Sequence, residues 1–514
     1  MFSWTQLNPD TWIHLNQTLL PTLLYNTAML IGGVSIGVSL LGVSLAWLTS
    51  LCDFPGRRWL TWGLMLPFAL PAYVLAFVFL GLFDFSGPVQ HGLRTLFGLP
   101  RHWSFEARHP LGVILVMSLV LYPYVYMLAR TAFMAQGHST FDAARSLGSS
   151  AWASFWRVSL PLARPAMMAG LSLALMEALA DFGAVSVFSF DTFTTAIYKT
   201  WFGFFDLHSA AQLASLLLLV VLLILWLEQY SRGRARFTQP LKAPQGRIQL
   251  RGLPCVLATF YTWSIFMLAF VLPIAQLLSW TWGVRYDVIT DYLALTGQTL
   301  ILGALAAGLT VSGALILAFT QRQQGDPRIR FSVRLSTLGY ALPGSVLAVG
   351  VMLCLTWLDQ RMADLAQWLT GTDPALWLTG TLAALLIAYF IRFLAVAHGP
   401  VDAALQRLQP SLPEAARTLG AHSSMLLCRL YWPILQPGLM VAALLVMVDV
   451  MKEMPATLLL RPFGWDTLSV RLYEFTSEGE WERAALPALM LIFAGLLPVL
   501  MLARSGHHSS YLHR

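Results

Sequence analysis

The sequence predicts an all-α polytopic membrane protein with about 11 transmembrane helices in two parallel-repeat halves. Its composition, its apolar runs and a repeat at one fixed offset support this fold class. Of the 514 residues, 57% are hydrophobic and only 11% are charged, whereas a soluble domain carries about 25% charged residues. Apolar runs of roughly 20 residues are long enough to cross a bilayer as helices. A soluble globule of this size does not need so many of them.

The apolar runs place eleven helices along the chain. The first is long for one span, so an interfacial helix followed by a membrane helix, split near Pro21 or the Gly32-Gly33 pair, is an alternative. The expected helices cover 20–50, 60–83, 110–132, 165–188, 208–228, 254–278, 297–320, 334–357, 376–398, 437–460 and 485–504.

The distribution of Lys and Arg predicts the orientation, because cytoplasmic loops are enriched in these residues. One set of alternating loops holds 22 of the 32 basic residues, the opposite set holds nine, and Lys452 lies inside a span. The N-terminus is therefore expected outside and the C-terminus in the cytoplasm. The N-terminal stretch lacks the positive region of a cleavable signal peptide. The richer set comprises 51–59, 130–164, 229–253, 321–333 with Arg334, 392–436 and the C-terminal tail.

An internal repeat relates the two halves at an offset of 272 residues. Eight of the 24 positions in "DAARSLGSSAWASFWRVSLPLARP" (142–165) are identical in "EAARTLGAHSSMLLCRLYWPILQP" (414–437), without a gap. The same offset pairs Thr27 with Thr299 and Pro71 with Pro343. Six crossings separate the two polar loops, so both loops face one side and the repeat is parallel.

The repeat divides the chain into three parts. Residues 1–230 form the first half, 231–253 form a basic cytoplasmic linker, and 254–514 form the second half. The helix expected at 254–278 has no counterpart, since its image would precede residue 1. The first half therefore has five expected spans and the second has six.

The repeated loop has a pattern that favours a helix, a turn and a second helix. An acid, Asp142 or Glu414, is expected to open a short helix, where its charge suits the helix dipole. A glycine then allows a sharp turn or the close approach of another backbone, and Pro161 or Pro433 restarts the chain toward the next span. The repeated residues are Asp142, Ala143, Ala144, Arg145 and Gly148 in the first copy and Glu414, Ala415, Ala416, Arg417 and Gly420 in the second.

This pattern resembles the cytoplasmic "EAA" loop of ABC importer permeases, and we call 142–165 and 414–437 coupling loops 1 and 2. The resemblance covers nearly the whole chain and is strongest to fused, two-copy permeases for ferric iron, in particular through "MKEMPATLLLRPFGWDTLSVRLYE" (451–474) and "LADFGAVSVFSFDTFTTAIY" (179–198). Fused permeases for thiamine, polyamines and related solutes share the architecture. The first copy departs from the pattern by a same-charge change, Asp142 for Glu.

The resemblance implies a type I importer fold, a bacterial inner-membrane location and an N-terminus in the periplasm. It implies two copies of a separate ATPase on the coupling loops and a periplasmic substrate-binding protein on the other face. The chain contains no GxxxxGK[ST] phosphate loop. ATP is therefore expected to be used by the partner, with no cofactor bound by this chain, no enzyme activity of its own and no nucleic-acid partner.

Ionisable residues inside membrane spans are costly and are functional candidates. Because Glu177 and Asp181 are four residues apart, they share one helix face, and Asp449 and Glu453 are their repeat images, with Lys452 adjacent. These groups are candidates for the translocation pathway, since carboxylates suit a hard cation such as ferric iron. Structural pairing with Lys452 or an arginine is the alternative.

The remaining candidates carry less information. Four widely spaced cysteines without CxxC spacing suggest apolar fillers rather than a metal site. His398 and His422 border the cytoplasmic side, and Trp201 and Tyr473 suit interfacial anchors. The outer-loop residues Tyr286, Asp287, Asp291 and Glu480 are candidate contacts for a binding protein.

Two other function classes remain as alternatives. An ion-coupled secondary transporter would leave the repeated coupling loops unexplained. A membrane enzyme would need a catalytic cluster, and none is evident in the sequence.

Overall fold

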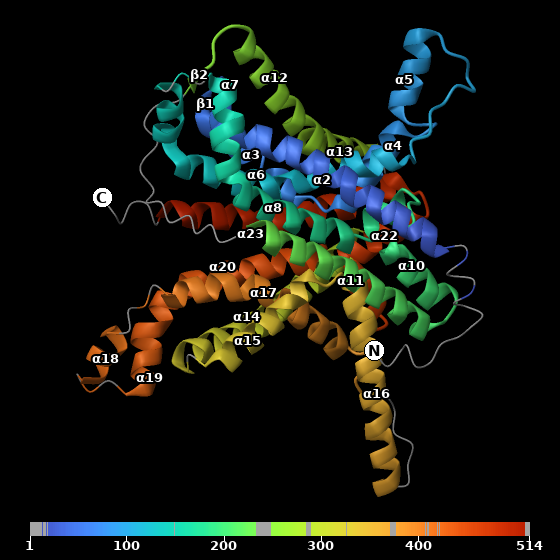
Figure 1. The fold of residues 1–514 in the computed structure, drawn as a ribbon. Helices are drawn as coiled ribbons and strands as arrows, with labels where there is room; N and C mark the ends of the chain where they lie inside the picture. Colours follow the sequence, from blue (N-terminus) through green and yellow to red (C-terminus); the bar gives the residue numbers. More distant parts are fainter. Residues whose placement is uncertain are drawn as a thin grey trace. The chain divides into compact units, whose positions relative to one another are not determined.

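The computed structural model describes residues 13, 17, 19–146, 148, 150–232, 248–283, 289–324, 326–370, 377–406, 408, 411–418, 420 and 422–508. They form almost only helices (Figure 1). The contacts divide the chain into two compact units. Unit 1 holds residues 1–284 and 476–485, and unit 2 holds residues 285–475 and 486–514.

Unit 1 is built on three long helices that pack on one another, α2 (Leu20–Leu51), α6 (Pro110–Ser146) and α8 (Leu160–Ala180) (Figure 1). Shorter helices pack around them, with α4 (Ala72–Phe83) against α9 (Gly183–Val187) and α10 (Phe193–Tyr198) against α11 (Leu207–Arg232). The remaining elements are β1 (Cys52–Asp53), α3 (Arg57–Gly63), η3 (Leu66–Ala69), α5 (Pro88–Phe97), α7 (Ala151–Ser154), η4 (Phe155–Ser159), η5 (Lys199–Gly203), β2 (Ile248–Gln249), α12 (Leu253–Phe266), η6 (Met267–Val271) and α13 (Leu272–Gly283).

Unit 2 repeats this packing with the corresponding helices α14 (Ile289–Gln324), α17 (Leu382–Gln406) and α20 (Trp432–Lys452). Helix α16 (Gly344–Thr370) packs on α21 (Pro455–Leu460), as α4 packs on α9. The same set of contacts in both units confirms the predicted repeat. The other elements are α15 (Pro327–Ser336), η7 (Thr337–Ala341), α18 (Ser411–Thr418), α19 (Ser423–Leu426) and η8 (Leu427–Tyr431), with α22 (Leu468–Ser477) and α23 (Trp481–His508) crossing the division between the units.

Ten helices among the described residues are long and apolar enough to span a membrane. Each overlaps one of the first ten predicted spans, although the bounds differ by 10 residues or more at Ala72–Phe97, Phe155–Ala180 and Gly344–Leu369. The eleventh prediction, 485–504, lies within the 28-residue helix α23, whose side chains from residue 497 onward lie outside the described part. The fold class, a polytopic all-α membrane protein, is therefore confirmed.

The first helix is not split at the Gly32-Gly33 pair. Helix α2 runs unbroken for 32 residues, and its glycines serve packing instead. A Cβ on Gly33 would lie 2.5 Å from Ile114 Cδ1, and one on Gly37 would overlap Ser118 of α6. Small residues spaced four apart let helix backbones approach closely in membranes, so these glycines fit α2 onto α6.

Four of the predicted continuous spans are wrong in one respect, because each contains a break. The predicted helix 60–83 is divided into α3, η3 and α4, and 334–357 into α15, η7 and α16. Leu70 and Leu342, which precede Pro71 and Pro343, have extended ψ angles of 127°, as the clash with the proline ring requires. The spans 165–188 and 437–460 break after α8 and α20, where Asp181 and Glu453 leave the helical conformation with ψ angles of 129° and 109°.

The helix at 253–283, which has no repeat counterpart, packs on elements of the first half. Its parts α12 and α13 contact α3 and α4. Gly56 and Gly63 bring α3 close to the rings of Trp263 and Phe266, and the strands β1 and β2 pair in parallel, which ties the end of the linker to the end of α2. The contacts therefore group this helix with unit 1, while the repeat boundary at 231–253 stays a sequence prediction.

The contact between α6 and α8 depends on Gly170. A Cβ there would lie 2.7 Å from Val125 Cα and 2.8 Å from the Tyr124 carbonyl oxygen, and backbone atoms cannot move aside. We therefore expect Gly170→Ala to lower the free energy of unfolding by about 1–3 kcal/mol, as overpacking does. A melting experiment in detergent measures this change.

Gly32→Ala is the matched control, because Gly32 is exposed on α2 with no atom within 4 Å of an added Cβ. Its melting temperature should stay at the wild-type value. Equal melting temperatures for both variants would contradict the predicted close contact.

Candidate coupling loops and translocation site

Coupling loop 2 consists of two short helices around a glycine turn. Helix α18 carries Glu414 in its first turn, where the carboxylate suits the helix dipole. Glu414 and Ala415 are exposed, and Gly420 follows with φ +82°. The chain then continues through α19 and η8 into α20, with Pro433 near its start. The predicted sequence of helix, glycine turn and helix is therefore observed.

Coupling loop 1 reaches the same glycine turn from a longer helix. The prediction that Asp142 opens a short helix is wrong, because α6 runs through this residue to Ser146. The second copy has prolines at 410 and 413 where the first has His138 and Phe141, so nothing in the first copy interrupts the helix. Gly148 has φ +86°, close to the value at Gly420. The side chains of Asp142, Ala143, Ala144, Arg145 and Arg417 lie outside the described part.

Both loop glycines serve the turn rather than a close contact. Gly148 and Gly420 are exposed, and a Cβ on either would meet no atom within 4 Å. A positive φ is costly for residues other than glycine. The glycines therefore hold the same left-handed turn at repeat-equivalent positions on an open surface.

Asp181 and Glu453 lie at the equivalent helix breaks of the two halves. Each carboxylate accepts a hydrogen bond from the backbone of the next short helix, Asp181 Oδ1 from Ala184 N at 2.7 Å and Glu453 Oε1 from Ala456 N at 3.2 Å. These bonds satisfy amide groups that a helix start leaves without a partner. The two predicted acids thus cap the N-terminal ends of α9 and α21.

Hydroxyl groups satisfy the carbonyl groups at the same breaks. Thr194 donates to the Asp181 carbonyl oxygen at 2.8 Å, and Ser469 donates to that of Glu453 at 3.3 Å. Thr194 and Ser469 correspond at an offset of 275, not 272, because three extra residues precede Asp466 in the second half. The polar support of the break is therefore repeated together with the break itself.

The length of each acidic side chain is complementary to the size of the residue that follows the proline at the neighbouring break. A Cβ on Gly344 would overlap Glu453 Oε1, so the glycine leaves room for the glutamate in its present conformation. At the equivalent positions the first half has Ala72 and the shorter Asp181. The longer acid is thus paired with the smaller neighbour, which indicates that α16 and α21 are fitted to each other around the carboxylate.

Glu453 also forms an ion pair with Arg392, a residue that the sequence analysis assigned to a cytoplasmic loop. Helix α17 places Arg392 inside a span, and its Nε lies 3.1 Å from Glu453 Oε2, with side-chain exposures of 5% and 6%. Arg392 also donates to the Leu342 carbonyl oxygen at 2.6 Å, at the break between η7 and α16. An isolated arginine within an apolar run was the signal that could have identified it.

The first half supports its proline break differently. Val120 occupies the position equivalent to Arg392, and two buried tyrosines of α6 contact the break instead. Tyr122 donates to the Leu64 carbonyl oxygen at 2.8 Å and Tyr126 to that of Thr61 at 3.1 Å. Both halves therefore satisfy carbonyl groups at the same break, one with neutral hydroxyls and the other with a charge.

The other predicted pathway residues lie in the last turns of α8 and α20. Glu177 precedes Asp181 by one turn, and its carbonyl oxygen accepts the Asp181 amide at 3.0 Å. Asp449 and Lys452 occupy the end of α20. No group of three His, Cys, Asp or Glu side chains placed to hold a metal ion occurs among the described residues. The geometry thus shows structural roles for Asp181 and Glu453, while a role in translocation stays a prediction.

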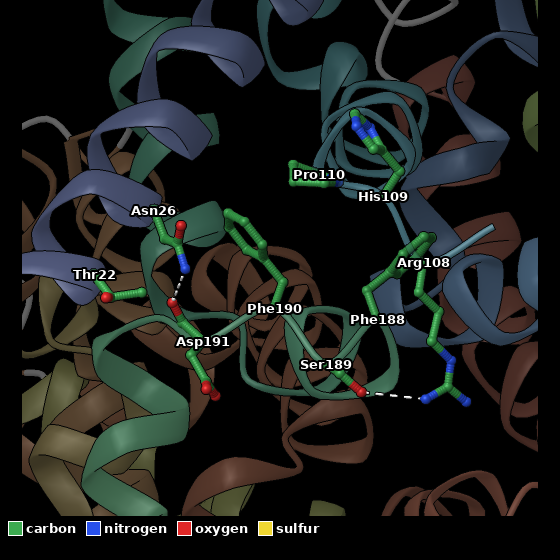
Figure 2. A pocket seen from close by; sticks show the side chains of 9 residues that line it. All are labelled: Thr22, Asn26, Arg108, His109, Pro110, Phe188, Ser189, Phe190 and Asp191. Carbon is green, nitrogen blue, oxygen red and sulfur yellow. Dashed lines mark hydrogen bonds between the residues drawn. The ribbon is translucent and has the colours of Figure 1, made fainter. Parts of the chain in front are cut away.

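A polar pocket of about 350 Å³ lies at the N-terminal ends of α2 and α6 (Figure 2). Arg108 donates to Ser189 Oγ at 3.2 Å, and Asn26 donates to the Asp191 carbonyl oxygen at 2.9 Å. Lys199 forms an ion pair with Asp191 at 2.6 Å. The pocket lies at the opposite end of α6 from coupling loop 1. The sequence analysis did not identify it, because its residues come from three distant segments.

The weaker candidates are dispersed. His422 is exposed beside Gly420, and His398 lies in α17. Glu480 is paired with Arg483 at 2.8 Å. Tyr286 and Asp287 lie outside the described residues, and the side chain of Asp291 is not described.

Comparison with known proteins identifies the class of this chain. Residues 19–236 and 310–507 match the family described as "Binding-protein-dependent transport system inner membrane component". The chain belongs to this family. It is thus a permease subunit of the ABC importer class, and the family implies an ATPase and a substrate-binding protein as partners. The family and the ten apolar helices also support a multi-pass location in the inner membrane.

Two relatives of this permease match most of its length, and a third matches about a third of it. The Fe(3+)-transport system permease protein FbpB 2 of Haemophilus influenzae is 28% identical over 94% of this chain and 89% of the relative. The ferric transport system permease protein FbpB of Actinobacillus pleuropneumoniae is 25% identical over 95% and 71%. The sulfate transport system permease protein CysW of Escherichia coli is 34% identical, over 31% of this chain and 54% of the relative.

The buried ion pair of the permease gives a stability prediction. Glu453→Gln keeps an oxygen for the Ala456 amide but leaves the charge of Arg392 buried without its counter-charge. We expect a loss of about 3–5 kcal/mol in the free energy of unfolding. The double variant Arg392→Met with Glu453→Gln should recover much of this loss, because it removes both charges. Unfolding of the purified chain in detergent measures each value.

The exposed pair of Glu480 and Arg483 supplies the control. Glu480→Gln should cost no more than about 1 kcal/mol, as for other surface pairs. A loss for Glu453→Gln as small as that for Glu480→Gln would show that the buried pair is not a stabilising contact.

Proposed function

We propose that this permease moves ferric iron from the periplasm to the cytoplasm, driven by ATP hydrolysis in a separate ATPase. Two copies of the ATPase dock on coupling loops 1 and 2, and a periplasmic substrate-binding protein delivers the iron. The N-terminus lies in the periplasm and the C-terminus in the cytoplasm. ATP binds the partner rather than this chain.

The observation that carries the proposal is the exposed glycine turn repeated in both halves. Gly148 and Gly420 hold the same left-handed conformation, and a Cβ added to either would meet no atom within 4 Å. Close packing therefore does not require these glycines, and an external partner that binds both halves explains why both retain the turn. A dimeric ATPase presents two equivalent binding sites and fits this requirement.

The proposed substrate rests on the relatives. Three relatives that cover most of the chain carry names of ferric iron permeases. A fourth of similar coverage is named only as a probable ABC transporter permease, and the sulfate permease matches less than a third of the chain. Thiamine, a polyamine or another small solute is the alternative cargo for the same machinery. An ion-coupled secondary transporter is a weaker alternative, because it would need no docking loops.

The proposed pathway passes the helix breaks at Asp181 and Glu453. Irregular backbone at membrane depth is tolerated where it is buried in protein or lines a cavity, and discontinuous helices mark substrate sites in other transporters. Glu177, Asp449 and Lys452 lie within one turn of these breaks. The carboxylates of Glu177 and Asp449 would attract a cation, and the positive charge of Lys452 would keep that attraction weak enough for the ion to pass.

Gly420→Ala tests the coupling role. The alanine meets no steric obstacle in the permease, but the positive φ costs about 1–2 kcal/mol. We expect the turn to change shape and ATP-driven uptake of radioactive ferric iron to fall severalfold in proteoliposomes with the ATPase and the binding protein. Thiamine, putrescine and sulfate offered in parallel should not be taken up.

Gly464→Ala is the matched control, since Gly464 is also exposed, has φ +80° and has no atom within 4 Å of an added Cβ. It lies outside both coupling loops, so its uptake should equal that of the wild type. Unchanged uptake by Gly420→Ala would rule out the coupling role. Uptake of another solute in place of iron would overturn only the substrate.

Neutralising the acids of the first half tests the pathway. Glu177→Gln with Asp181→Asn removes two charges and keeps an oxygen for the Ala184 amide. We expect slower iron uptake, with the ATPase rate and the melting temperature unchanged. Asp206→Asn is the control, because Asp206 caps α11 through Ser209 in the same way. Wild-type uptake by the double variant would remove these acids from the pathway.

A further inference from the structure

A short basic and aromatic helix occurs at the same position in both halves. Helix α3 and helix α15 each follow the first long helix of their half, α2 or α14. At the offset of 272, Arg58 corresponds to Arg330 and Trp59 to Phe331. Both arginines are exposed, and the two rings are 83% and 68% exposed. Each helix also has a buried residue at a corresponding position, Thr61 in α3 and Val333 in α15.

Each of these helices lies at the end of its own unit that carries the coupling loop. In unit 1, Thr49 near the end of α2 contacts Tyr126 of α6, and Trp47 packs on Phe133 further toward coupling loop 1. In unit 2, Arg322 near the end of α14 donates to the Leu405 carbonyl oxygen at the end of α17. Each short helix therefore begins within a few residues of this end of its unit.

The exposed side of α3 continues a surface suited to lipid. Helix α12 packs on α3, and its outward residues Leu253, Val256 and Phe260 are 64–71% exposed in an apolar span. A ring such as Trp59 beside this surface suits the boundary between acyl chains and headgroups, where tryptophan is enriched. On α15, Leu335 adds an apolar side chain that is 58% exposed.

The charge next to these rings is positive. Arg57 is engaged by Asp53 at 3.2 Å and by the Thr49 carbonyl oxygen at 3.0 Å. Within the part of the chain that the structure describes, Arg58 has no hydrogen-bond or ion-pair partner. A pocket of about 270 Å³ lies beside Arg58 and Trp59, and its arginines outnumber its single acid. An anion adjoining acyl chains would complement this surface.

We propose that α3 and α15 each bind an anionic phospholipid of the leaflet on the coupling-loop side. The arginine, Arg58 or Arg330, contacts the phosphate, and the ring of Trp59 or Phe331 lies against the acyl chain below it. Basic residues combined with apolar side chains on a short helix bind anionic membrane surfaces in this way. Repetition in both halves argues against a chance exposure of four side chains.

Native mass spectrometry of the purified chain tests the proposal. The detergent-solubilised protein is titrated with phosphatidylglycerol or with phosphatidylcholine. The wild type should retain phosphatidylglycerol in preference, and Arg58→Gln with Arg330→Gln should weaken its binding at each site about fivefold. Because both residues are exposed, the double variant should fold normally. Binding of phosphatidylcholine should not change.

Arg101→Gln with Arg361→Gln is the matched control, since it removes two exposed arginines that lie outside α3 and α15, one in the turn after α5 and one in the second half of α16. It should retain phosphatidylglycerol as the wild type does. Equal retention by all three proteins would overturn the proposal. So would full displacement of the lipid by free glycerol phosphate, which would show an anion site without acyl-chain contact. Weaker binding of the ATPase with unchanged lipid binding would assign the surface to a protein.

Discussion

The structure depends on hydrogen bonds to the backbone amide and carbonyl groups that are left without a helical partner where helices break inside an apolar environment. No water is available there to replace a lost helical hydrogen bond, so each unpaired group costs several kcal/mol. Around the breaks at Asp181 and Glu453, carboxylates accept the amides and hydroxyls donate to the carbonyl groups. Polar side chains therefore lie at the points where these helices break.

The two halves meet this constraint with different residues. In the second half, Arg392 bridges Glu453 and the Leu342 carbonyl oxygen, which joins two breaks through one buried cation. In the first half, Tyr122 and Tyr126 use neutral hydroxyls. A charged bridge is strong only while both partners are in place, so rearrangement of the second half would cost more. The halves therefore have the same helix breaks, but the interactions that stabilise these breaks differ in strength.

Much of this arrangement could be predicted from the sequence, and the exceptions have physical reasons. Apolar runs located ten spans, and the fixed offset located both glycine turns. The breaks were missed because Asp181 and the proline at Pro71 sit within runs that remain apolar on average. Arg392 was counted with a loop because its counter-charge is 61 residues away along the chain, and only the packing of α17 on α20 brings them together.

The exposed glycine turns are alike in the two halves, whereas some of the contacts inside the units differ. Gly148 and Gly420 keep φ values of +86° and +82°, although one follows a 37-residue helix and the other an eight-residue helix. Inside the units, Ala72 and Asp181 of the first half are replaced together by Gly344 and Glu453 in the second. Internal contacts can change in concert within one half, because both partners belong to the same chain. A surface that meets two copies of one partner lacks this freedom, because the single sequence of that partner must fit both loops. On the proposed function, the retained turns are therefore a consequence of the symmetric ATPase.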